Sequence, residues 1–149
     1  MEIVNKLWGH EQILVNNDRY CAKLLHIQPG YECSLHYHKI KKETFIVIEG
    51  RVRLVIGNRT DTKAHILAIG DSITLDPFTW HRFSSYNSGT SVILEVSSTH
   101  SDDDVVRLEP SRKLPNDKKY ETATAFTTCP IKPRADSVEY GHEYARMVL

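Results

Sequence analysis

Residues 30–50 read GYECSLHYHKIKKETFIVIEG, and this stretch decides how the rest of the chain is interpreted. His36 and His38 are two positions apart, so on an extended strand their side chains leave from the same face. Glu43 follows a polar, turn-like segment and opens the strand-like run 44–48, so we expect it on a neighbouring strand opposite the histidines. Two imidazoles and one carboxylate would then meet at one point.

A second stretch, residues 70–83, adds a fourth polar group. It reads GDSITLDPFTWHRF and carries His81 at the start of another predicted strand. Three imidazole nitrogens and one carboxylate oxygen form a suitable ligand set for a divalent transition metal, and they leave coordination positions open for water or a substrate. We therefore predict a metal site that consists of His36, His38, Glu43 and His81.

Each histidine also has a simpler explanation. The chain contains eight histidines in 149 residues, so one His-x-His pair by chance is unsurprising. A single histidine on a strand is more often hydrogen-bonded or at the surface than a metal ligand. We apply this simpler explanation to His10, His26, His65 and His142, and not to the four predicted ligands, because only their spacing matches a known pattern.

The length and composition of the chain indicate a single globular domain. At 149 residues, 40% of them hydrophobic, the chain suffices for a single core. Its formal net charge is zero, which gives no electrostatic basis for binding nucleic acid or a membrane surface. The first ten residues lack the apolar core of a signal peptide, and no run reaches transmembrane length. The three cysteines, Cys21, Cys33 and Cys129, have no zinc-finger spacing, so we expect reduced thiols and a cytoplasmic protein.

Several strands follow from alternation and turn residues. Residues 44–48 and 51–56 are both strand-like, and the tight turn at residues 49–50 is typical of a β-hairpin. We therefore expect these two strands to pair directly. Shorter strands are predicted at 65–69 and 72–75.

The strand predicted at 20–28 leaves open where Lys23 points. Its alternation puts Cys21, Lys23, Leu25 and Ile27 on one face. If that face is the inner one, Lys23 has to meet an anion or a substrate oxygen, because an unpaired buried charge is unfavourable. The alternation alone does not decide whether Lys23 points inward or outward, and both alternatives stay open.

Two later stretches carry charged candidates. The strand predicted at 91–96 holds Glu95 among aliphatic residues, which makes it a candidate general acid or base, with a structural ion pair as the alternative. Arg107 and Arg112 follow the acidic run at residues 102–104, and a planar guanidinium suits a carboxylate or a phosphate. A salt bridge between Arg107 and that acidic run is equally open.

The two ligand-bearing stretches resemble the two motifs of the cupin superfamily. The first motif, G-x5-HxH-x4-E-x6-G, is matched at all its fixed positions from Gly30 to Gly50. The second, G-x5-P-x-G-x2-H, is matched at Gly70 and His81. Asp76 and Phe78 stand where proline and glycine are usual, which concerns the turn before His81 more than the ligand itself. The resemblance implies an all-β cupin jelly-roll barrel, or double-stranded β-helix.

A closer resemblance covers residues 7–113. The Trp8-Gly9 pair, the ETFIVIEGRV strand, and the run from Glu95 to Asp103-Asp104-Val105-Val106-Arg107 are similar to the cupin domain of type II mannose-6-phosphate isomerases and their short sugar-isomerase-like relatives. The later run is the more specific part, since generic cupins lack it. We expect a cupin barrel over residues 1–113 and an irregular C-terminal extension over residues 114–149, packed on the barrel or on a second subunit.

This resemblance implies a metal-dependent aldose–ketose isomerase that acts on a sugar or sugar phosphate. One divalent transition ion, zinc first, with manganese, nickel or iron as alternatives, would be held by the four predicted ligands and would stabilise an enediolate. Glu95 would be the first choice for the base that moves a proton between C1 and C2, with Lys23 second. Arg107 would hold a phosphate or the distal hydroxyls. The resemblance also implies a homodimer.

Three other functions use a similar barrel. An iron-dependent cupin dioxygenase has the same three-histidine and carboxylate shell. The ligand types alone do not tell iron from zinc, manganese or nickel. A sugar-binding cupin without catalysis is the second alternative. A nucleotide-sugar epimerase is disfavoured because those cupins typically work without metal, whereas the ligand set here is complete.

Overall fold

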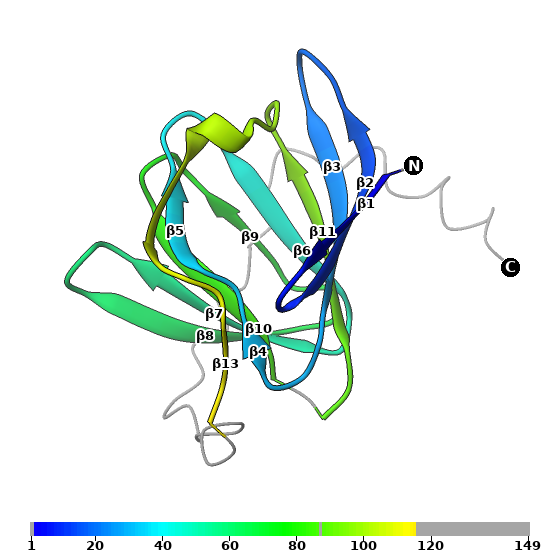
Figure 1. The fold of residues 1–149 in the computed structure, drawn as a ribbon, viewed down its shortest axis with the longest axis vertical. Helices are drawn as coiled ribbons and strands as arrows, with labels where there is room; N and C mark the ends of the chain where they lie inside the picture. The colour runs from blue at the N-terminus through cyan, green and yellow to red at the C-terminus, as the bar shows by residue number, and fades with distance from the viewer. Residues whose placement is uncertain (1, 87, 116–149) are drawn as a thin grey trace, which may run out of the picture.

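Two antiparallel β-sheets form the molecule (Figure 1). The computed structural model describes residues 2–86 and 88–115, and most of these lie in strands. The one helical element in this part of the chain is the single turn η1 (Asp102–Asp104). The predicted all-β class is confirmed, while the expected extension lies, from residue 116 onward, outside the described residues.

Six strands form the first sheet. They are β1 (Glu2–Lys6), β2 (Gly9–Asn16), β3 (Cys21–Ile27), β6 (Glu43–Glu49), β9 (Ser72–Leu75) and β11 (Ser91–Ser97). Their order across the sheet is β1-β2-β3-β11-β6-β9, and all neighbouring pairs are antiparallel. The last residues of the predicted strands at 72–75 and 91–96 fall within one residue of the observed ends.

The second sheet is built around β10 (Trp80–Ser85). One edge of β10 pairs with β7 (Arg51–Gly57), which pairs in turn with β8 (Thr62–Ala68). The other edge pairs with two short strands, β4 (Tyr31–Glu32) and β5 (Leu35–His38). Outside these two lie β13 (Arg112–Lys113) and β12 (Val105–Glu109). This sheet carries three of the four predicted metal ligands.

The predicted hairpin between residues 44–48 and 51–56 is wrong. β6 pairs with β11 and β9, whereas β7 pairs with β10 and β8, so the chain passes from one sheet to the other between them. Gly50 has φ +74°, a left-handed conformation that glycine adopts at little cost. A tight turn serves a crossing between sheets as well as a hairpin, so turn chemistry alone could not separate the two.

The inner faces of the sheets enclose one apolar core. Both sheets contribute to it, through Trp8, Leu25, Ile27, Phe45, Val47, Val52, Leu54, Phe83 and Ile93. The face of β3 that holds Cys21, Lys23, Leu25 and Ile27 is the buried one. The Lys23 side chain therefore points inward, and the residue is 1% exposed.

Candidate metal centre

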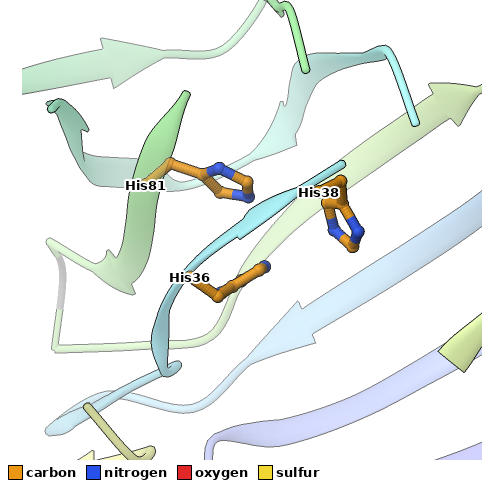
Figure 2. A group of neighbouring side chains, drawn as sticks. All are labelled: His36, His38 and His81. Atoms are coloured by element: carbon orange, nitrogen blue, oxygen red, sulfur yellow. The ribbon is translucent and has the colours of Figure 1, made fainter. Parts of the chain in front are cut away.

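Three imidazoles meet inside the barrel. His36 and His38 lie on β5 and His81 lies on β10, where it is in direct register with His36. Figure 2 shows the three rings gathered on one side of these strands. One ring nitrogen from each histidine lies within 4.8 Å of the others. The structure thus brings together histidines from both of the stretches that the sequence singled out.

Backbone carbonyls fix the protonation of two of these rings. Nδ1 of His36 lies 2.8 Å from the carbonyl oxygen of Ser34, and Nδ1 of His81 lies 2.9 Å from that of Thr79. A carbonyl only accepts, so each Nδ1 carries a proton and Nε2 is the ring nitrogen left to bind a metal. Nε2 of His81 is buried without a hydrogen-bond partner in the described part of the chain. This is the arrangement expected of metal-binding histidines, so the residues fit a divalent transition ion.

Glu43 lies opposite the histidines, as predicted, and opens β6 in the first sheet. The chain leaves β5 and enters β6 on the opposite side of the barrel, so Glu43 faces the rings across the interior. Its Oε1 lies 3.0 Å from Nε2 of His81, without hydrogen-bond geometry, and its Oε2 lies 4.0 Å from Nε2 of His38. Burial raises the pKa of Glu43, but His81 and Lys41 outweigh this and hold the pKa below its ordinary value.

Asp104 lies beside the third imidazole, that of His38, whose Nδ1 has no hydrogen-bond partner among the described residues. Its carboxylate accepts backbone N–H groups of Lys39, Ile40 and Lys41 at 3.0, 2.8 and 2.9 Å. Its Oδ2 also lies 3.4 Å from Nδ1 of His38. Sequence reasoning missed this residue, because nothing in a run of three aspartates marks which one turns inward.

Lys41 is a second residue that sequence reasoning missed. It is 4% exposed, and its Nζ lies 2.6 Å from Oε2 of Glu43 and 2.8 Å from Oε1 of Glu95. Burial alone would lower the pKa of Lys41, but the carboxylates of Glu95 and Glu43 raise it above the ordinary value. A lysine in a polar, turn-like segment gives no signal of such burial. The ammonium group therefore joins a predicted metal ligand to the predicted base.

Glu95 lies on the inner face of β11 and is 4% exposed. It is in register with Lys23 on β3 and with Phe45 on β6, so it sits in the middle of the first sheet. Its contact with Lys41 is the ion pair that was one of the two alternatives. Because Glu95 also lines the cavity beside the histidines, this pairing does not remove it from the candidate chemistry.

Lys23 forms an ion pair with Glu11 on the neighbouring strand β2. Its Nζ donates to Oε2 of Glu11 at 3.0 Å, and Lys6 approaches the other oxygen of Glu11 at 3.6 Å. The buried charge of Lys23 is thus neutralised by the protein itself.

The two arginines differ in their surroundings. Arg112 Nε donates to Oε1 of Glu32 at 2.6 Å, in a network with Arg82 and Glu109. Arg107 is exposed on β12, lines the cavity, and forms no ion pair within residues 2–86 and 88–115. The salt bridge to the acidic run, one of its two alternatives, is therefore absent from that part of the structure.

One cavity contains all of these candidates except Asp104 and Arg112. Its apolar wall is made of core residues, and its polar wall of charged side chains and imidazoles. Among the lining residues are Trp8, Leu25, Phe45, Phe83, Glu11, Lys23, His36, His38, Lys41, Glu43, His81, Glu95, His100 and Arg107. An apolar wall with convergent polar groups is typical of a small-molecule site.

Comparison with known proteins agrees with the fold and the position of the site. A family model described as "Cupin domain" matches residues 23–97, about half of the chain. The chain belongs to the cupin family. The matched region of this cupin contains the three clustered histidines, Glu43, Lys41 and Glu95, so the family resemblance drawn from the two motifs is confirmed.

Two curated relatives of this cupin are named for sugars. D-lyxose/D-mannose isomerase of Thermosediminibacter oceani is 34% identical, and the match covers 62% of this chain and 62% of that protein. Mannose-1-phosphate guanylyltransferase of Sinorhizobium fredii is 25% identical over 75% of this chain, but the match covers only 22% of that protein. The chain thus spans less than two thirds of either relative.

A solved structure shows the same fold. In the oxalate decarboxylase of Bacillus subtilis, described with Mn(II) centres, the superposition has a TM-score of 0.63 at 19% identity. It covers 72% of this chain and 30% of that one. The described part of this cupin contains no helix that is long and apolar enough to cross a membrane.

Proposed function

We propose that this cupin is a metal-dependent aldose–ketose isomerase that acts on a sugar or sugar phosphate. The observation that carries the proposal is the buried chain of contacts from Glu43 through Lys41 to Glu95. It holds a carboxylate suited to proton transfer in the same cavity as the three clustered histidines. The similarity to a sugar isomerase and to a second enzyme named for mannose 1-phosphate supports the substrate class.

In this proposal His36, His38, His81 and Glu43 hold one divalent transition ion. Zinc remains the first choice, with manganese, nickel and iron as alternatives; manganese is the ion named for the oxalate decarboxylase of similar fold. When bound, the ion supplies positive charge that stabilises the negative charge that develops on the sugar oxygens.

Glu95 is the proposed base that moves a proton between C1 and C2. Lys41 and Ser97 both contact its Oε1, at 2.8 and 3.4 Å, so we assign the proton transfer to Oε2. Lys23 stays second, because its Nζ already donates to Glu11.

Arg107 is the proposed contact for the far end of the substrate. Its guanidinium is exposed at the cavity and has no carboxylate partner in the described residues. A guanidinium in this position suits a phosphate, through paired hydrogen bonds, or the distal hydroxyls of a free sugar.

Product analysis tests this function against the two alternatives. Protein loaded in turn with zinc, manganese, nickel and iron is incubated with D-mannose, D-lyxose and mannose 6-phosphate, and NMR follows the sugars. We expect a ketose from at least one sugar, and only from metal-loaded protein. Oxygen uptake without a ketose would favour a dioxygenase, and sugar binding without any product would favour a binding protein; either result would contradict the isomerase.

A further inference from the structure

His100 lies in the segment between β11 and η1 and lines the same cavity as the candidate metal centre. It does not belong to the group of side chains that could hold a metal ion among the described residues, which consists of His36, His38 and His81. The charges of Lys23, Lys41, Glu95 and Glu11 all act on its ring. The imidazole is therefore near the proposed base, but outside the ligand set.

The backbone of His100 is fixed by the end of a distant strand. Its N–H donates to Oδ1 of Asn16 at 3.0 Å, and Nδ2 of Asn16 donates back to its carbonyl oxygen at 3.2 Å. These reciprocal bonds join residues 84 positions apart in the sequence. The backbone at His100 is thus tied to the end of β2, and its placement does not depend on the loop alone.

The two ring nitrogens of His100 have different surroundings. Nε2 lies 3.4 Å from Oδ1 of Asp102, which favours the proton on Nε2. Nδ1 is buried and has no hydrogen-bond partner in the described part of the chain. In His36 and His81, by contrast, a carbonyl oxygen lies within hydrogen-bond distance of Nδ1. Because buried polar atoms are normally hydrogen-bonded, an unpaired Nδ1 beside a cavity indicates a place for a ligand donor.

We propose that His100 is a substrate-binding residue, whose Nδ1 accepts a hydrogen bond from a sugar hydroxyl away from C1 and C2. The proposal rests on the proposed sugar isomerase function. Burial lowers the pKa of His100, and the positive charges of Lys23 and Lys41 lower it further, against the opposing effects of Glu95 and Glu11. The imidazole is then neutral near pH 7, and a neutral acceptor suits a hydroxyl group.

Three variants separate binding from folding. His100→Phe keeps a flat ring and removes both nitrogens, His100→Asn keeps an acceptor near the position of Nδ1, and His65→Phe makes the same change outside the cavity. With metal-loaded protein and D-mannose, D-lyxose and mannose 6-phosphate as probes, we measure the dissociation constant by calorimetry, and KM and kcat for each sugar that is turned over.

We expect His100→Phe to raise the dissociation constant and KM at least tenfold while kcat changes less than threefold. His100→Asn should recover most of the loss, and His65→Phe should match the wild type. Unchanged affinity in His100→Phe, or an equal loss in His100→Asn, would overturn the binding role and leave the isomerase intact. Sugar binding that depends on His100 without any turnover would support the binding role and contradict the isomerase. A wild-type protein that binds none of the probes would overturn both.

Discussion

Lys41 joins the two carboxylates on which the proposed chemistry depends. It contacts Glu43 and Glu95 at 2.6 and 2.8 Å, and all three side chains are almost completely buried. Ion pairs of this kind are no guarantee of net stability, but removal of one partner leaves an uncompensated charge in the interior. A substitution of Lys41 therefore tests both the proposed site and the stability of the fold.

Lys41→Met should cost about 3–5 kcal/mol of unfolding free energy in the metal-free protein, because two buried carboxylates lose their cation. Urea denaturation measures this loss. Lys42→Met is the matched control, since Lys42 pairs with Asp76 at 2.7 Å where both side chains are more than half exposed. We expect a change of at most about 1 kcal/mol there. Equal losses in the two variants would contradict the buried role of Lys41.

Asp104→Asn should weaken metal binding by about 10–100-fold, because its carboxylate lies 3.4 Å from Nδ1 of His38, and a carboxylate beside a metal-binding histidine supports the basicity and orientation of that ring. The amide can still accept some of the backbone hydrogen bonds from residues 39–41, so the fold should persist. Competition with a chromophoric chelator measures the affinity. Asp103→Asn, an exposed neighbour, should bind metal like the wild type. Wild-type affinity in Asp104→Asn would remove Asp104 from the metal centre.

The elements of this barrel were easier to predict than the contacts between them. The spacing of His36 and His38 is local, and the two cupin motifs taken together could predict that His81 shares their site. The contact from Lys41 to Glu95 spans 54 positions and that from Asp104 to Lys41 spans 63, and no local pattern carries such contacts. The crossing at Gly50 was missed because β7 pairs with β10 and β8, and not with β6.

One departure from the cupin motif lies in the turn before His81. Phe78, where glycine is usual, has φ +66°, and its backbone N–H donates to the carbonyl oxygen of His38 at 2.8 Å. A residue with a side chain thus takes a left-handed conformation that is disfavoured for it. The departure was expected to concern the turn before His81 more than the ligand itself, and His81 does lie beside His36 and His38.

Gly9, at the start of β2, leaves no room for a side chain. A Cβ at this residue would lie 1.8 Å from the carbonyl oxygen of His26 on β3, and its φ is +142°. Gly9→Ala should therefore destabilise the barrel by more than the roughly 1 kcal/mol of a backbone effect alone. Thermal unfolding measures the difference.

Gly70→Ala supplies the control for Gly9→Ala. Gly70 also has a left-handed φ, +89°, but a Cβ there would meet no atom within 4 Å. Gly70→Ala should lower the free energy of unfolding by about 1 kcal/mol, which is the backbone contribution by itself. If both variants lost the same stability, close packing of Gly9 against β3 would not be the cause.

At the scale of the whole molecule, the homodimer remains a prediction. Light scattering on the purified protein should give twice the 17.1 kDa of the chain. A monomer at micromolar concentration would contradict it. The candidate centre draws its residues from both sheets of one chain, so a monomer would leave the proposed site complete.

The most direct test of the proposed function is deuterium exchange at C2 of the sugar in heavy water, with metal-loaded wild type and Glu95→Gln side by side. NMR follows the C2 proton, and elemental analysis of the same samples confirms that both proteins hold the metal. We predict exchange and ketose formation in the wild type, and loss of both in Glu95→Gln with metal content unchanged. Exchange that persists in Glu95→Gln would remove Glu95 from the role of base, and absence of exchange in folded, metal-bound wild type would contradict the isomerase itself.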